Sequence, residues 1–220
     1  VNDRLQKLIL TAVKALLYVL TVIITAEALG FNTSSLTALL SVLTLGITLA
    51  AEDILGNVAG GLVILSSRPF AVGDFIEAGG ISGTVREIGL NHTKLETPDG
   101  QMVLMPNKDL SSSKIINYTV LGRRRVVRTV TASYDAPTED VKAACLEAVA
   151  AAPGILSDPA PAVQLTNYGA SSIEYTIFCW CSVEDYWPVY FAVNENLRST
   201  FANHGVEMTY DHLNVHVVNK

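Results

Sequence analysis

The charged residues of this chain are distributed unevenly, which limits the folds it can adopt. Residues 1–66 carry seven charged side chains, whereas the rest of the chain carries 29. Leu8–Leu29 is apolar apart from Lys14, Glu27 and a few hydroxyl groups, and Ser34–Ala51 is 18 residues without a charge. A helix of that length measures about 27 Å, close to the ~30 Å hydrocarbon core of a bilayer. We therefore expect two membrane helices joined by a short turn.

The overall composition excludes several classes of protein. Charged residues make up 16% of the 220 residues, below the roughly 25% of soluble domains. With three cysteines and no Cys-x-x-Cys spacing, the chain is not a disulfide scaffold; Cys179 and Cys181 share one face of a predicted strand and are interpreted as core residues. The formal net charge of −6 and a single short arginine run, 123–128, give no basic face for nucleic acid.

The second apolar segment differs from an ordinary lipid-facing helix. Val42, Leu45 and Leu49 recur at spacings of three and four, so they share one helix face. In a symmetric ring this face would form stacked apolar collars, although a plain hairpin anchor remains the alternative. Small and hydroxyl side chains, which allow close helix approach, are frequent here: Ala38, Ser41, Thr44, Gly46, Thr48, Ala50 and Ala51.

Two adjacent acids end this apolar run. Because charge is costly inside a bilayer, Glu52 and Asp53 should reach water or the cytoplasmic interface. The uncharged segment 54–67 is too short to span the membrane. We expect a bend near residues 52–53, followed by an interfacial helix. Basic residues flank the helices at residues 4, 7 and 68 and are absent from the turn, which predicts that both ends are cytoplasmic.

The remaining chain is predicted to form two soluble domains. Arg68-Pro69-Phe70 ends the helix, and short alternating strands separated by glycine turns indicate a small β-barrel or sandwich over 68–121. Residues 122–210 follow the order β-α-β-β-α-β of a ferredoxin-like domain, with Val206–Thr209 as the last strand. A terminal strand within 211–220 has no local partner, which suggests pairing with other subunits. We find no catalytic constellation and no predicted metal site.

These segments share an ordered set of motifs with a known family. The chain resembles the family of the mechanosensitive channel of small conductance (MscS) from about residue 30 to its end. The motifs are Leu-Ala-Ala-Glu-Asp-Ile-Leu-Gly-Asn-Val-Ala-Gly-Gly at 49–61, Arg-Pro-Phe-x-x-Gly-Asp at 68–74, Gly-Gly-x-x-Gly-x-Val at 79–85, Thr-Pro-Asp-Gly at 97–100, Pro-Asn at 106–107 and Ile-Ile-Asn-Tyr at 115–118.

The resemblance implies a particular architecture. Residues 5–29 match the second family transmembrane helix and 34–67 the third, which lines the pore; the first is not in this chain. The fold implied is a membrane α-helical pore segment, a small Sm/SH3-like β-domain and an α+β ferredoxin-like domain. Seven identical subunits would enclose a cytoplasmic vestibule, and their 211–220 strands would close a small barrel.

The resemblance also implies roles for individual residues. Leu45 and Leu49 would form the pore constriction, and Arg68-Pro69-Phe70 would connect the pore helix to the β-domain. Asp53 stands where the family has a glycine at the first helix bend. Helix packing is assigned to Ala38, Ser41, Val42, Thr44, Gly46 and Thr48, and bending to Glu52, Asp53, Gly56 and Gly61.

The function implied is a channel of the plasma (inner) membrane, opened by tension, that releases ions and small solutes during hypo-osmotic shock. Its partners would be the lipid bilayer, identical subunits and the permeating solutes, with no nucleic acid, no cofactor and no enzymatic activity. The alternative is a membrane-anchored scaffold that binds a ligand or partner without conducting ions.

Overall fold

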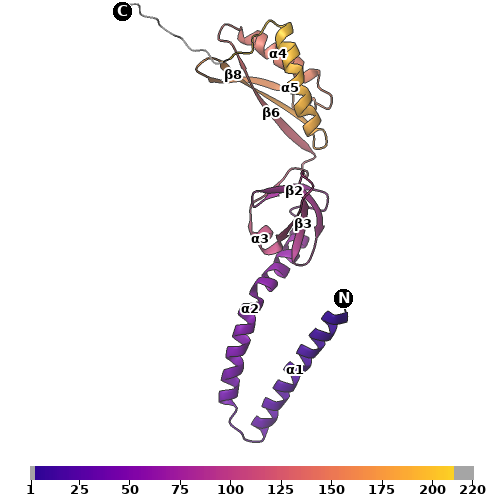
Figure 1. Cartoon of the computed structure of the whole chain (residues 1–220), viewed down its shortest axis with the longest axis vertical. Coiled ribbons are helices and arrows are strands. Elements are labelled where there is room, and N and C mark those ends of the chain that lie inside the picture. Colours follow the sequence, from indigo (N-terminus) through magenta and orange to yellow (C-terminus); the bar gives the residue numbers. More distant parts are fainter. Residues whose placement is uncertain (1–2, 211–220) are drawn as a thin grey trace, which may run out of the picture.

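The computed structural model describes residues 3–210 and begins with two long helices. Helix α1 spans Asp3–Ala28 and α2 spans Ser34–Ser67. They diverge from the turn between them, as Figure 1 shows. Gly30 has a φ of +82° in this turn, and the Asn32 side-chain oxygen accepts a 3.0 Å hydrogen bond from the amide of Ser34 at the start of α2. Both helices are long and apolar enough to cross a membrane.

Helix α2 is longer than one membrane crossing requires. Its 34 residues give a length of about 51 Å at 1.5 Å per residue, against a hydrocarbon core of ~30 Å. The helix assignment is continuous through residues 52–53 and Gly61, so it is not broken at either expected bend. It ends where the sequence predicts, because Arg68 adopts a left-handed conformation with φ 48° and its amide donates to the Ile64 carbonyl.

The β-domain is a five-stranded antiparallel sheet in the order β4-β3-β2-β1-β5. Its core contains Ile76, Val85 and Leu95 from the sheet, together with Ile64 from α2 and Leu110 from α3. The end of α2 is therefore part of this domain. The elements are β1 (Phe75–Ala78), β2 (Ile81–Ile88), β3 (His92–Glu96), β4 (Met102–Pro106), α3 (Asn107–Ser112) and β5 (Ile115–Asn117).

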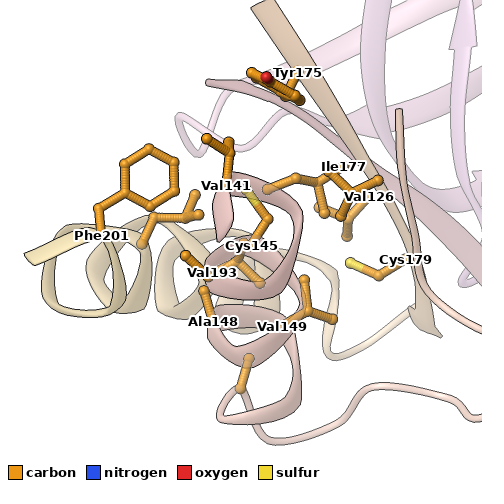
Figure 2. Close-up of a cluster of buried hydrophobic side chains, with 14 of the residues drawn as sticks. Val126, Val141, Cys145, Ala148, Val149, Tyr175, Ile177, Cys179, Val193 and Phe201 are labelled. Atoms are coloured by element: carbon orange, nitrogen blue, oxygen red, sulfur yellow. The ribbon is translucent and has the colours of Figure 1, made fainter. Parts of the chain in front are cut away.

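The α+β domain places two helices on one face of a three-stranded antiparallel sheet in the order β6-β8-β7. Figure 2 shows Cys145 of α4 and Val193 of α5 facing Ile177 and Cys179 of β8. Cys179 and Cys181 are both fully buried, as their shared strand face predicted. The elements are β6 (Arg123–Ala132), α4 (Thr138–Ala150), β7 (Ala162–Tyr168), β8 (Ile173–Ser182) and α5 (Tyr186–Asn203).

The predicted last strand of this domain, Val206–Thr209, is wrong: the structure has no strand there. Gly205 turns the chain with a φ of 66°. Val206 is buried, and its amide donates to the Phe201 carbonyl at 2.8 Å. The segment therefore closes the end of α5 instead of pairing with β6. The predicted strand within 211–220 lies outside the described residues.

An aromatic and arginine stack joins the two soluble domains. The guanidinium of Arg124 lies 4.5 Å from the ring centre of Tyr118 and 3.6 Å from that of Tyr186. The Tyr118 hydroxyl donates a 2.7 Å hydrogen bond to Glu77 in β1, and this bond raises the pKa of Tyr118. The stack therefore connects β1 through Arg124 to the start of α5.

Candidate functional site

The first half of α2 presents an apolar face without a partner among the described residues. Val42, Leu45 and Leu49 are 70%, 60% and 62% exposed, and at 100° per residue they lie within an arc of about 60°. The predicted packing residues are also uncovered: nothing lies within 4 Å of a Cβ added at Gly46. An apolar surface of this extent needs lipid or another protein chain to cover it.

The hydroxyl groups among the predicted packing residues form hydrogen bonds within the helix. Ser41, Thr44 and Thr48 each donate to the carbonyl oxygen four residues earlier, at 2.9, 2.8 and 2.8 Å. A hydroxyl bonded in this way avoids the cost of burial without a partner. These side chains are thus compatible with an apolar environment while remaining small enough for close helix packing.

The second half of α2 lies against α3 and the loop after β2. A Cβ added at Gly60 would be 2.6 Å from the Asn107 carbonyl oxygen, and one at Gly61 would be 2.6 Å from the Leu90 carbonyl oxygen. Such distances are too short for real Cβ atoms, so both positions require glycine. Gly61, predicted as a bend residue, is therefore a position of close backbone contact.

Asn107 supports this contact from inside the β-domain. Its side chain is fully buried and donates to the carbonyl oxygens of Gly89 and Leu90 at 2.9 and 3.0 Å. Its side-chain oxygen accepts a 2.8 Å hydrogen bond from the hydroxyl of Thr93. These three bonds fix the loop against which Gly61 packs.

Lys108 follows Asn107 in α3 and contacts three residues of α2. These residues lie about one turn before Gly60 and Gly61. The ammonium group of Lys108 lies 2.9 Å from a carboxylate oxygen of Asp53, and its amide donates to the Asn57 side-chain oxygen at 3.0 Å. The stem of Lys108 lies over Gly56, where an added Cβ would be 3.0 Å from Cδ. The hydrogen bond to Asp53 and the charge of that carboxylate raise the pKa of Lys108.

The predicted connection at Arg68-Pro69-Phe70 also contacts the β-domain. Phe70 lies in its core. The Asn117 side-chain amide donates to the Pro69 carbonyl at 3.2 Å and to the Asp74 carboxylate at 2.8 Å. The Arg-Pro-Phe segment is thus attached to β5 as well as to the core.

The structure brings together some of the predicted residues and separates others. Asp53, Gly56 and Gly61 meet the β-domain, whereas Glu52 is exposed. Asn107 and Lys108 complete the contact, but we did not single them out from the sequence. The Pro-Asn motif that contains Asn107 gives no local indication of what its side chain contacts. Lys108 could not be identified because its partners lie 51 and 55 residues away in the sequence.

Comparison with known families agrees with this arrangement. Residues 53–120 match the model of the mechanosensitive ion channel β-domain, and residues 126–208 match that of the MscS C-terminal region. Together these matches cover more than half of the chain. This chain belongs to the MscS family. The β-domain model begins at residue 53, within α2, where the contacts with α3 also begin.

Individual MscS-family relatives extend the similarity over the helices. The chain is 32% identical to a small-conductance mechanosensitive channel of Edwardsiella ictaluri, over 79% of this chain and 60% of that protein. It is 27% identical to a small-conductance mechanosensitive channel of Helicobacter pylori, over 93% and 75%. A crystal structure of Helicobacter pylori MscS, described as its closed state, superposes with a TM-score of 0.90 at 25% identity, over 100% and 87%.

Membership of the MscS family assigns the chain to the membrane channels and not to the enzymes. The two long apolar helices agree with a membrane location. Within residues 3–210 there is no group of three or more His, Cys, Asp or Glu side chains placed to hold a metal ion.

Proposed function

We propose that this MscS-family chain forms a homoheptameric channel that membrane tension opens, releasing ions and small solutes during hypo-osmotic shock. The channel would lie in the plasma (inner) membrane, with both soluble domains in the cytoplasm. The cytoplasmic orientation is supported by basic residues at the membrane ends of the chain and an uncharged turn between the helices.

The observation that carries this proposal is the division of α2 into two halves. Leu45 and Leu49 lie in the half whose apolar face is uncovered, whereas Gly60, Gly61 and Ile64 are buried against the β-domain. A hairpin that only anchored the protein would not need a spanning helix built into the soluble domain. In a ring of subunits, this arrangement would couple the pore-lining half to the cytoplasmic body.

Closure would come from the leucine face. When Leu45 and Leu49 of seven subunits face one axis, they form a narrow apolar constriction. Water leaves such a constriction, and ions that cannot shed their hydration are excluded without a physical plug. Ala38, Ser41, Val42, Thr44, Gly46 and Thr48 would provide the surfaces along which neighbouring helices pack.

Opening would be driven by the area that the channel occupies in the bilayer. Tension favours the state of larger area in proportion to the area difference, as a ligand favours the state that it binds more tightly. In this proposal the 34–51 helices tilt and the leucine rings separate. The exposed segment 10–28 would be the surface on which the bilayer acts.

The test is a pressure-ramp recording on the purified protein in liposomes. We expect unitary currents that appear above a tension threshold and vanish when tension is released. Protein-free liposomes serve as the control. A silent but folded and inserted protein would contradict the channel and favour the scaffold alternative, since a scaffold needs no conductance.

A further inference from the structure

Among residues 3–210, the ion pair between Asp53 and Lys108 joins the long helix α2 to the β-domain. It connects Asp53, four residues beyond Leu49, with the second residue of α3, and its N–O distance is 2.9 Å. The pair therefore lies at the transition between the half of α2 with an uncovered apolar face and the half that packs against the β-domain. A movement of the uncovered half that carries Asp53 away from α3 would break this pair.

Lys108 is held along one turn of α2 by contacts of three kinds. Its main-chain amide donates to Asn57, its stem crosses Gly56, and its ammonium group reaches Asp53. Asn57 in turn donates to the main-chain carbonyl of Asp53 at 2.8 Å. The main-chain contact therefore places Lys108 beside this turn of α2, within reach of Asp53.

The pair is open to solvent. The side chains of Lys108 and Asp53 are 47% and 87% exposed. Two further carboxylates, those of Glu52 and Asp109, act on the same ammonium group. Charges at such positions are screened by dissolved ions, over a distance of about 10 Å at 0.1 M salt and about 3 Å at 1 M. The strength of this contact therefore depends on the salt concentration around it.

We propose that Asp53 and Lys108 form a salt-sensitive latch, which holds α2 against α3 in the closed channel and makes the opening tension depend on cytoplasmic ionic strength. This inference rests on the proposed channel function. The assignment of this contact to the closed state is supported by the superposition on the Helicobacter structure described as closed. Lys108 is a positioning residue: it acts on the pore through the orientation of α2.

The number of subunits makes a weak pair significant. An exposed ion pair typically changes an equilibrium by about 1.4- to five-fold. If the pair breaks in all seven subunits on opening, a two-fold effect in each multiplies to about a hundred-fold in the ratio of closed to open channels. Low salt would then stabilise the closed state, and dilution of the cytoplasm would strengthen the latch as the cell swells.

The test uses excised inside-out patches containing the full-length wild type or one of three variants, Asp53→Asn, Lys108→Met or their combination. The bath is varied from low to high ionic strength at constant osmolarity with sucrose, and the tension of half-maximal opening is measured. We expect this tension to fall with salt in wild type. In Lys108→Met it should already be low in dilute salt and nearly independent of salt. Asp53→Asn should lower it in dilute salt and keep only the weaker salt dependence that Glu52 and Asp109 supply, and the double variant should behave like Lys108→Met.

A matched control separates the latch from general screening. The ion pair between Lys94 and Glu87, at 2.6 Å, is also exposed but lies entirely within the β-domain sheet. Lys94→Met should therefore keep the salt dependence of the wild type. A wild-type opening tension that does not change with salt would overturn the latch, as would a Lys94→Met variant that behaves like Lys108→Met.

A second measurement keeps the latch testable without conduction. Hydrogen exchange of residues 107–112 in nanodiscs should accelerate with salt in the wild type, and should be fast at all salt concentrations in Lys108→Met. If the wild type never conducts under tension, the channel proposal fails while this measurement still decides whether the contact exists. Exchange that is the same in both proteins at every salt concentration would refute the salt-sensitive contact itself.

Discussion

Gly60 of α2 lies directly against the backbone of Asn107 in α3. A Cβ added at Gly60 would be 2.6 Å from the Asn107 carbonyl oxygen and 2.8 Å from the Lys108 amide nitrogen. These neighbours are backbone atoms, which cannot rotate away as a side chain can. The close contact between α2 and the β-domain therefore depends on the absence of a side chain at this position.

Gly60→Ala should separate α2 from α3. The added methyl group overpacks a backbone contact, which costs about 1–3 kcal/mol and exceeds the helix-propensity gain of up to about 1 kcal/mol. We expect faster hydrogen exchange over residues 107–112 and a changed opening tension. Gly46→Ala is the control for the exchange measurement, because it is the same substitution in α2 and nothing lies within 4 Å of a Cβ added at Gly46. Equal effects of both substitutions would contradict the backbone-contact interpretation.

The leucine face of α2 gives a second prediction. Leu45→Ser or Leu49→Ser should wet the proposed constriction, so that channels conduct without applied tension and cells grow slowly. Leu43→Ser is a matched control, since Leu43 is as exposed in the single chain as Leu45 but lies about 160° away around the helix. Growth assays and patch recordings measure both effects. Leu45→Ser channels that do not conduct without applied tension would contradict the placement of Leu45 in the constriction. A Leu43→Ser variant that leaks equally would contradict it as well.

Much of the fold was predictable because its elements are long and regular. The apolar segments predicted α1 and α2, and the residue before Pro69 predicted where α2 ends. Alternation over β8 placed Cys179 and Cys181 on the buried face, as observed. In these segments the local pattern and the tertiary contacts favour the same structure.

The elements that we missed have little local pattern. Helix α3 has six residues, among them Lys108 and Asp109, and is too short to show a helical period. Strand β5 has three residues and forms by pairing with β1. Both elements are stabilised by segments distant in the sequence. Conversely, we predicted a strand at Val206–Thr209 from its residue types, but the segment does not form one. Val206 is instead buried against the end of α5.

The buried amide of Asn107 leads to a third prediction. Asn107→Leu would leave the Gly89 and Leu90 carbonyls and the Thr93 hydroxyl without their present partner. Each buried group left unsatisfied costs about 1–3 kcal/mol. We expect strand β3 and the loop before it to exchange amide hydrogens faster. Thr93→Val removes one of the three bonds and should have a smaller effect; a Thr93→Val effect as large as that of Asn107→Leu would argue against the network.

The cysteines give a prediction about pH. Burial raises the pKa of Cys145 from 9.0 to about 12 and that of Cys179 to about 11. At pH 8 the thiolate fraction of Cys145 is then roughly one in ten thousand, whereas an exposed thiol has roughly one in four. Since the thiolate is the reactive form, iodoacetamide should leave both residues unmodified in the native protein and modify them after unfolding.

The same pKa shifts determine how stability changes with pH. A thiol whose pKa is raised in the folded state loses its proton first in the unfolded state, so these cysteines destabilise the fold as pH rises above about 9.

Iodoacetamide labelling followed by mass spectrometry from pH 7 to 10 measures the reactivity of the two cysteines. Asp99→Cys, at an exposed turn, should react throughout that range. Native Cys145 reacting as fast as this engineered thiol at pH 8 would show that the α+β core opens, contrary to its complete burial between α4, α5 and the sheet.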